Sequence, residues 1–263
     1  MEISAPIPST TTFATVSPTV PPYSLPPGRF MNEDILFCVD IDVESKTELK
    51  LMNTRLDVMK HAILFFVNAK HSICPDHRFC FSILSETFSW LRKEFTNDVN
   101  LAAKAIRSLT AFDRSCGSAD LTSLFQVAKQ ESIKSHADGR LFRVILIYCR
   151  SSAQPVHRWP VSEKAFTMDV LYLHDKPGPE NCPQKVFDSL LDVVEHVSQY
   201  EGYVFENGQG SPRALFRQMC LLLCHPMQRC LQEDLDIPKS IIKKTSGSTE
   251  GAIGDEGKQI QTR

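Results

Sequence analysis

The sequence lacks long hydrophobic runs and a strong excess of charge of one sign. No apolar stretch reaches the about 18 residues that a membrane-spanning helix needs. The 263 residues include 29 Lys and Arg and 31 Asp and Glu, which gives a formal net charge of −2. No overall positive field is therefore expected to recruit nucleic acid or an acidic membrane. The N-terminus also lacks the basic start and apolar core of a signal peptide.

Sequence patterns typical of enzymes are missing as well. There is no nucleophile elbow, no Gly-rich phosphate-binding loop and no His-Glu-x-x-His metalloprotease motif. Eight histidines and nine cysteines make chance pairs common, so such pairs alone do not indicate catalysis. We expect the chain to have no enzymatic activity and no cofactor of its own.

The cysteines do not suggest a disulfide framework. Nine is an odd number, and they are spread through predicted strands and helices, which fits a reduced intracellular protein. Cys74, His77 and Cys80 resemble part of a zinc motif, but structural zinc normally has four ligands and no second pair follows at suitable spacing. We expect no zinc site, and a location in the cytoplasm, the nucleus or both.

Two terminal segments differ in composition from the rest of the chain. Residues 1–30 are rich in Pro, Ser and Thr, and residues 236–263 are polar and show no periodicity. Neither segment can bury enough apolar area to offset the entropy of ordering, so we predict two disordered tails. Lys239, Lys243 and Lys244 are too sparse for a nuclear localisation signal and are interpreted as part of a solvated tail. Residues 31–235 are predicted to form one folded domain.

Strand and helix patterns alternate within this domain. Residues 34–40 are apolar on both faces, which is typical of a buried strand in a parallel sheet. Further strands are predicted at 78–84, 88–95, 140–149, 168–175 and 202–207, and helices at about 45–66, 97–112, 120–136, 183–197 and from 211 onward. The alternation predicts an α/β domain in which helices cover both faces of a mostly parallel sheet.

Two of the predicted helices begin with capping signals. Ser45 and Glu48 have the spacing of a capping box, in which each side chain would bind the other residue's backbone N–H. Asn181 can cap the helix that opens near Pro183.

An acidic cluster directly follows the first predicted strand. In CVDIDVESK, residues 38–46, Asp40, Asp42 and Glu44 alternate with other residues. Alternate residues of an extended stretch point the same way, so Asp40 and Asp42 could share a cation. The cluster could instead form an exposed anionic rim at a helix N-terminus, where partial positive charge favours anions. We favour this second interpretation, with a structural or partner-binding role.

The chain resembles the von Willebrand factor A family over about residues 34–229. The strand-end acids, the helix segment TRLDVMKHAILFFV, the loop CGSADLTSLFQVA and the strand RVILIYC carry the resemblance. It implies a Rossmann-like, mostly parallel α/β sheet with one antiparallel edge strand and helices on both faces.

The resemblance also implies that an inherited metal site is degenerate. Metal-binding members of the family use an Asp-x-Ser-x-Ser run, a Thr in a later loop and an Asp at the end of the fourth strand. Asp40 keeps the first position, but Asp42 and Glu44 replace the serines. Ala119 stands in place of the Thr and Cys149 in place of the last Asp. We therefore expect no metal ion.

A narrower resemblance links the chain to the A-domain scaffold subunits of the BRISC and BRCA-A type deubiquitinase complexes. It is carried by the segments LFCVDID, MDVLYLHD and LLLCHPMQR. It implies a non-catalytic adaptor that stabilises and helps target an enzyme specific for lysine-63-linked ubiquitin chains, in the DNA damage response or in cytoplasmic signalling. The implied partners are a JAMM-type catalytic subunit, an Abraxas-like subunit and a subunit with a ubiquitin-variant fold.

Candidate partner contacts lie in two places. One is the acidic cluster, and the other is the segment with His225, Pro226 and Arg229, which is predicted to end the last helix. That segment could equally be a plain helix terminus, since His225 and Arg229 are favourable near the C-terminal dipole. Two alternative functions remain open: a ubiquitin receptor or proteasome- or repair-factor-associated A domain, and a cation-dependent adhesive A domain, against which the missing ligands count.

Overall fold

The structure, a computed structural model, describes residues 31–49, 53–160, 163–208 and 211–235. The predicted disordered tails, including Lys239, Lys243 and Lys244, lie outside these residues, so both tails and the domain boundaries stay predictions. Within the described residues, no helix is both long enough and apolar enough to span a bilayer.

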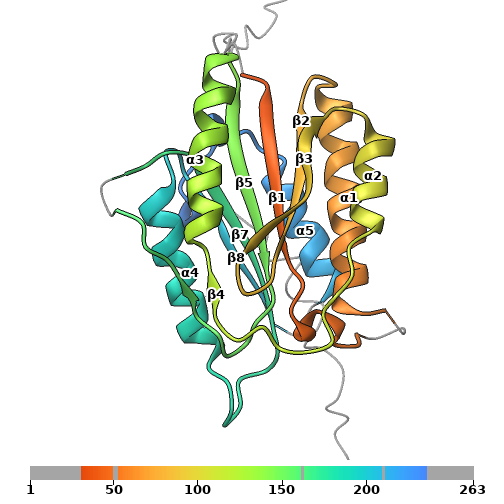
Figure 1. Ribbon diagram of the computed structural model, residues 1–263, viewed down its shortest axis with the longest axis vertical. Coiled ribbons are helices and arrows are strands. Elements are labelled where there is room, and N and C mark those ends of the chain that lie inside the picture. Colours follow the sequence, from red (N-terminus) through yellow and green to blue (C-terminus); the bar gives the residue numbers. More distant parts are fainter. Residues whose placement is uncertain (1–30, 50–52, 161–162, 209–210, 236–263) are drawn as a thin grey trace, which may run out of the picture. The chain divides into compact units, whose positions relative to one another are not determined.

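A six-stranded sheet forms the centre of the domain (Figure 1). Its order is β3-β2-β1-β5-β7-β8, and only the edge pair of β2 and β3 is antiparallel. The strands are β1 (Glu33–Asp40), β2 (Arg78–Leu84), β3 (Phe88–Thr96), β5 (Leu141–Tyr148), β7 (Thr167–His174) and β8 (Val204–Gly208). The predicted mostly parallel sheet with one antiparallel edge strand is therefore confirmed.

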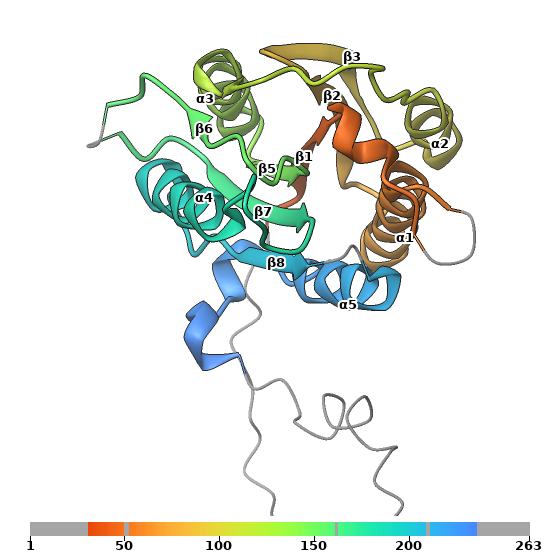
Figure 2. The same ribbon diagram turned by 90° about the horizontal axis from the view of Figure 1, so that it is seen from below.

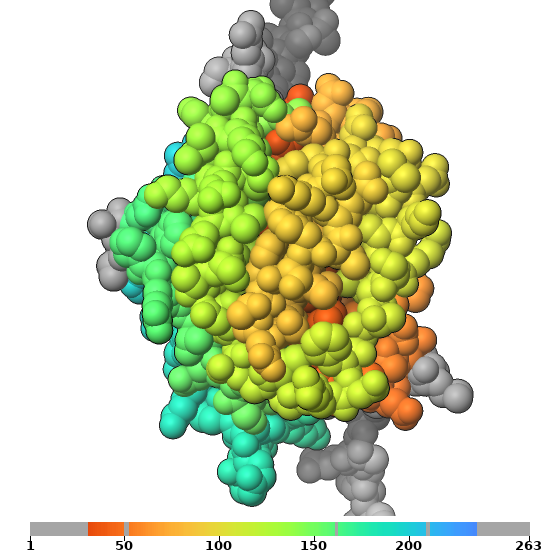
Figure 3. Space-filling model, in the orientation of Figure 1, coloured from red at the N-terminus to blue at the C-terminus, as the bar shows by residue number. Residues whose placement is uncertain are grey.

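Helices cover both faces of this sheet (Figure 2). On one face lie α1 (Arg55–Ile73), α2 (Val99–Arg107) and α5 (Pro212–Leu222), and on the other α3 (Thr122–Ala137) and α4 (Pro183–Val197). Two hydrophobic cores result because neighbouring residues of a strand point to opposite faces: Phe37 packs into the first core and Leu36 into the second. Little red is visible on the surface in Figure 3, and all residues of β1 are buried.

The first helix begins later than the capping pattern predicts. Ser45 lies in a short 3-10 helix, η1 (Val43–Lys46), and its hydroxyl caps nothing. The capping box of α1 is formed by Thr54 and Asp57, whose side chains each accept a hydrogen bond from the other residue's backbone N–H, at 3.0 and 3.1 Å. The predicted Ser45 cap is therefore wrong. The Asn181 cap is wrong too, because its side chain accepts a hydrogen bond from the Gly178 N–H and no side chain caps α4.

Two short strands were not predicted. β4 (Ala119–Asp120) and β6 (Pro155–Val156) form a small parallel ladder beside the carboxyl ends of the main strands. At the same ends, the connections from β1 and β5 leave in opposite directions across the sheet. Open α/β sheets place their ligand sites at such a reversal of strand order. Asp40 and Cys149, at the ends of β1 and β5, lie there.

Candidate functional site

The carboxylate of Asp40, at the end of β1, is fully buried and binds an arginine of the same chain. Arg150, two residues after β5, donates from Nε and Nη2 to the two oxygens of Asp40 at 3.0 Å. The backbone N–H groups of Cys149 and Asp42 donate to the same carboxylate at 3.2 and 3.1 Å. Both carboxylate oxygens of Asp40 thus accept hydrogen bonds from groups of the same chain.

Arg150 also connects three loops around Asp40. Its Nη1 donates to the Gly117 carbonyl at 3.0 Å, and Nη2 donates to the Ser85 carbonyl. Gly117 has a φ of 65°, a left-handed conformation that favours glycine. Burial opposes the charged form of Arg150, but the Asp40 carboxylate outweighs this effect and raises the pKa of the arginine above its ordinary value. The guanidinium therefore stays charged and holds the strand ends together.

The two other acids of the cluster also bind backbone groups. Asp42 is buried and accepts hydrogen bonds from the N–H groups of Glu44 and Cys116, at 3.1 and 2.6 Å. Glu44 is half-buried and accepts from the N–H and hydroxyl of Ser151, at 2.9 and 2.5 Å. Burial raises the pKa of Glu44, and the Ser151 hydrogen bonds oppose this rise. The acids therefore fix loops to the strand ends.

A second buried arginine completes the same region. Arg55, the first residue of α1, is fully buried and donates from Nη2 to Asp175 at 2.7 Å. Its Nη1 donates to the carbonyls of Glu44 and Cys149 at 3.3 and 3.4 Å. Two guanidinium groups therefore lie at the carboxyl ends of the parallel strands, beside the acids that the sequence suggested as metal ligands.

These residues do not fit a divalent cation. Magnesium requires near-octahedral oxygen ligands, but the charged Arg150 already binds both oxygens of Asp40. Ala119 is buried in β4 and offers no side-chain oxygen, and the buried Cys149 thiol has a pKa well above its ordinary value because of burial. No group of three or more potential metal-binding side chains lies close together in the part of the chain that the structure describes.

The interpretation of the acidic cluster as an exposed rim is wrong for two of its three members. Asp40 and Asp42 are 0% and 1% exposed, because Arg150 and the Cys116 loop cover them. Their side chains do not face solvent, so a partner would reach Glu44 and the surrounding loops first. Whether any of the three acids contacts a partner stays a prediction.

Arg229 belongs to a second buried ionic network, at the opposite ends of the strands. Its guanidinium pairs with both oxygens of Asp169, at 2.5 and 3.1 Å, and Arg143 donates to Asp169 at 2.6 Å. Arg143 also binds Glu33, which binds Lys70 in turn. Burial alone would raise the pKa of Glu33, but the charges of Arg143 and Lys70 outweigh it and hold the pKa below its ordinary value. All five side chains are buried.

The predicted partner segment at His225 therefore points inward. The last helix, α5, ends at Leu222, and Pro226 opens a separate 3-10 helix, η2 (Pro226–Gln228), so the prediction that this segment ends the helix is wrong. The His225 ring accepts a hydrogen bond from the Met227 N–H and contacts the Met31 carbonyl at 3.0 Å. Burial lowers the pKa of His225. Pro226 is buried as well, and a partner contact of this segment stays untested.

Sequence reasoning missed the arginines that matter most. Arg150 directly follows Cys149, where a family metal ligand is replaced, but nothing in the sequence indicates that it pairs with Asp40. The second network could have been predicted from Arg143 and Asp169, because each is a charged residue inside a mainly apolar strand. A buried charge needs a partner, so such positions indicate an internal ion pair.

The arrangement of the sheet and its helices identifies the fold. The mostly parallel six-stranded sheet, its one antiparallel edge strand and the helices on both faces match the arrangement that the sequence resemblance implies. The fold is of the von Willebrand factor A type. What this A-type domain lacks is the metal-ligand set, of which Asp40 alone keeps its residue type.

Comparison with known proteins agrees at the level of the fold. No protein-family model matches the sequence, and no curated protein sequence does. A D319A mutant of the PilB minor pilin from Streptococcus sanguinis is similar in structure, with a TM-score of 0.51 and 10% identity. The match covers 75% of this chain and 62% of the pilin chain, so the A-type domain corresponds to only part of that protein.

Two further similar structures are A domains by name. The SpRpn10 VWA domain gives a TM-score of 0.48 and 13% identity, over 71% of this chain and 93% of that one. A von Willebrand factor type A structure from Catenulispora acidiphila gives 0.44 and 13% identity, over 73% and 42%.

Proposed function

We propose that the chain is a non-catalytic scaffold subunit that stabilises and helps to target a deubiquitinase complex specific for lysine-63-linked chains. Its partners are a JAMM-type catalytic subunit, an Abraxas-like subunit and a subunit with a ubiquitin-variant fold. The complex acts in the nucleus in DNA repair, in the cytoplasm in signalling, or in both. The catalytic zinc belongs to the JAMM-type subunit.

The ion pair between Asp40 and Arg150 is the observation that favours this proposal over a cation-dependent adhesive A domain. In a metal-dependent A domain the cation has open positions through which it binds an acidic group of the partner. Here the guanidinium uses its donors on Asp40, Gly117 and Ser85 within the chain. Recognition through a bridging cation is therefore disfavoured, and the adhesive alternative loses its mechanism. The resemblance of the segments LFCVDID, MDVLYLHD and LLLCHPMQR to deubiquitinase scaffold subunits supports this specific function.

Purification of the protein at its endogenous level, followed by mass spectrometry, tests the proposal. A tag at the C-terminus and gentle salt would preserve contacts made by the folded domain. We expect a JAMM-type peptidase and an Abraxas-like protein among the recovered proteins. Recovery of neither would refute the scaffold function.

A direct binding assay separates the scaffold from a ubiquitin receptor. The purified chain alone is titrated with lysine-63-linked and lysine-48-linked di-ubiquitin. The scaffold proposal expects no linkage-specific binding by the isolated chain, because the specificity belongs to the assembled enzyme. Linkage-specific binding without other subunits would favour the receptor alternative instead.

A further inference from the structure

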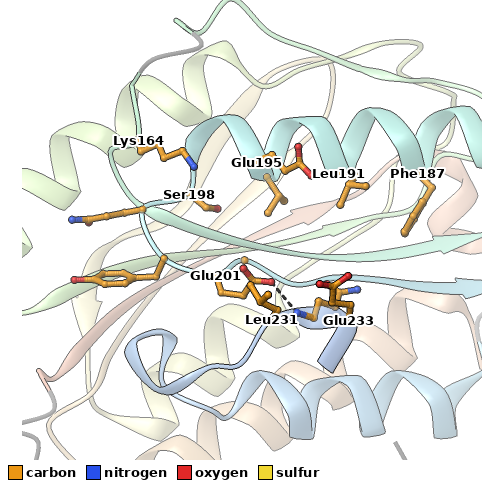
Figure 4. Close-up of a pocket in the computed structure, with 13 residues that line it drawn as sticks. Lys164, Phe187, Leu191, Glu195, Ser198, Glu201, Leu231 and Glu233 are labelled. Atoms are coloured by element: carbon orange, nitrogen blue, oxygen red, sulfur yellow. Dashed lines mark hydrogen bonds between the residues drawn. The ribbon is translucent and has the colours of Figure 1, made fainter. Parts of the chain in front are cut away.

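A groove separates α4 from the chain segment that follows η2 (Figure 4). Its volume is about 930 Å³. Phe187, Leu191 and Val194 of α4 form an apolar wall, and Leu231 faces them from the C-terminal segment. Leu191 and Leu231 are 38% and 52% exposed, so both side chains are accessible from the groove. The groove offers an apolar surface without an assigned function.

The rim of this groove carries mainly negative charge. Glu195, Glu201 and Glu233 line it, and Lys164 is its only basic lining residue among those that the structure describes. Glu201 accepts a hydrogen bond from the Gln232 N–H at 2.9 Å, the contact drawn as a dashed line in Figure 4. Glu195 and Glu233 are exposed. Three carboxylates around apolar side chains favour an occupant that combines apolar and basic residues.

The wall formed by the C-terminal segment is firmly attached to the sheet. The Gln232 side chain accepts from the Val204 N–H at 2.7 Å and donates to the Val204 carbonyl at 2.8 Å. Gln232 thereby takes the hydrogen bonds that another strand would make at this point of the β8 edge. The Tyr203 hydroxyl donates to the Cys230 carbonyl at 2.9 Å. The groove is therefore built into the fold, and its occupant inserts beside β8 without pairing at Val204.

The sequence that continues from this wall has the required chemistry. The described chain reaches residue 235, two positions after the groove residue Glu233. Residues 237–244, IPKSIIKK, contain three isoleucines and three lysines and no acid. We propose that residues 237–244 fold back into the groove between α4 and the C-terminal segment, with isoleucines against Leu191 and Leu231 and lysines against the glutamates. For these residues the proposal replaces the solvated tail that the composition alone predicts. This docking is independent of the proposed scaffold function.

The short tether makes even a weak contact effective. A flexible connection of a few residues gives an effective concentration on the order of millimolar. A segment with an intrinsic dissociation constant on the order of 0.1 mM would then be docked about ten times as often as free.

Limited digestion of the full chain with trypsin tests the docking. Cleavage after Lys243 and Lys244 is measured by mass spectrometry relative to cleavage after Lys258, which serves as a reference in the same molecule. A synthetic peptide of residues 236–263 gives the ratio for the free segment. For the dissociation constant on the order of 0.1 mM taken above, we expect this ratio to be about tenfold lower in the full chain. A ratio equal to that of the peptide would overturn the proposal.

Groove variants show whether the protection comes from this surface. The combined substitution Glu195→Gln and Glu233→Gln, or Leu191→Asn, is expected to raise the ratio toward that of the peptide. Asp192→Asn removes an exposed acid of the same helix outside the groove and is expected to change nothing. Protection that survives both groove changes would refute the assignment.

Concentration dependence separates the other possible occupants. Docking within one chain predicts the same ratio at all protein concentrations. Protection that grows with concentration, together with a doubled mass in light scattering, would place a second copy in the groove. Protection that requires an added partner protein would place that partner there. Either result contradicts docking of residues 237–244 within the chain.

Discussion

At the residue scale, Arg150 holds several loops together around Asp40, as a metal ion would, but it does not offer a binding site for a partner. A guanidinium has five N–H donors in a fixed plane and matches a carboxylate with two of them. Arg150 directs the others at the carbonyls of Gly117 and Ser85, so several loops meet on one cation. A metal ion at this place could bind an oxygen of a partner as a further ligand, whereas Arg150 directs its N–H donors at oxygens within the chain.

Replacing Arg150 by alanine is expected to destabilise the fold strongly. The substitution leaves the Asp40 carboxylate buried without a countercharge, and breaking a buried pair in this way costs about 3–5 kcal/mol. Urea unfolding followed by circular dichroism gives the change in the free energy of unfolding. Arg158→Ala, at an exposed position a few residues later, is the control and is expected to change it by less than about 0.5 kcal/mol.

The double variant Asp40→Asn with Arg150→Met separates pairing from packing. Because it removes both charges, we expect it to lose less stability than the sum of the losses measured for Asp40→Asn alone and Arg150→Met alone. Additive losses would show that the two side chains stabilise the fold independently of each other.

The same geometry predicts that the strand-end acids do not bind divalent cations. Isothermal titration of the wild-type chain with Mg²⁺ and Ca²⁺ is expected to show no saturable heat, because Arg150 holds both oxygens of Asp40. Asp40→Ala serves as the matched titration. Micromolar binding by the wild type that disappears in Asp40→Ala would show that the site is still a metal site.

At the scale of elements, α1 shows how a correct local pattern can mark the wrong place. Ser45 and Glu48 have capping-box spacing, but the chain makes a 3-10 turn there, and Glu48 forms a β-bridge with Thr54. Thr54 and Asp57 have the same spacing and cap the real helix. The spacing alone does not separate the two pairs. In the structure, the start at Thr54 places the buried Arg55 within 2.7 Å of Asp175 at the strand ends.

Two alanine substitutions distinguish these capping pairs. Thr54→Ala removes the acceptor of the Asp57 N–H and is expected to lower the free energy of unfolding by about 1 kcal/mol. Ser45→Ala removes a buried hydroxyl that has no hydrogen-bond partner among the described residues, so we expect little or no loss. Thermal or urea unfolding of both variants measures the difference. A larger loss for Ser45→Ala would favour the start of α1 that the sequence suggested.

The strands could be predicted from the sequence because their signal is local. Buried central strands are apolar on both faces, and the limits predicted for β1, β2 and β7 lie within one residue of those observed. The ladder of β4 and β6 could not be found this way, since each strand has only two residues and its partner lies more than 30 positions away. Pairing of Asp40 with Arg150 has the same difficulty, with a separation of 110 residues.

At the scale of the whole molecule, buried ion pairs lie at both ends of the sheet. Asp40 with Arg150 closes the carboxyl ends of the strands, and Glu33 with Arg143 lies at the amino ends. Between them lie the two hydrophobic cores on the two faces of the sheet. A buried charge without its partner is costly, so each ion pair favours the fold in which its two residues, distant in sequence, lie together.

Acid is expected to weaken this arrangement through His77, which lies beside Glu33. The ring of His77 accepts a hydrogen bond from the Glu33 N–H at 2.9 Å and is 5% exposed. Burial lowers the pKa of His77 to about 4, although the charge of Glu33 opposes the shift. The unfolded chain, with the ordinary pKa of about 6.5, therefore binds a proton between pH 6.5 and 4 that the folded protein does not.

The free energy of unfolding should consequently fall as the pH decreases from 6.5 to 4, and His77 should contribute about 3 kcal/mol of this fall. His77→Gln keeps a hydrogen-bond acceptor but cannot titrate, so the difference between urea unfolding at pH 7 and at pH 4.5 should shrink by about 2–3 kcal/mol. His61→Gln, on the exposed side of α1, is the control and should keep the wild-type difference. If His77→Gln keeps that difference as well, the neutral buried histidine is not the source of the acid sensitivity.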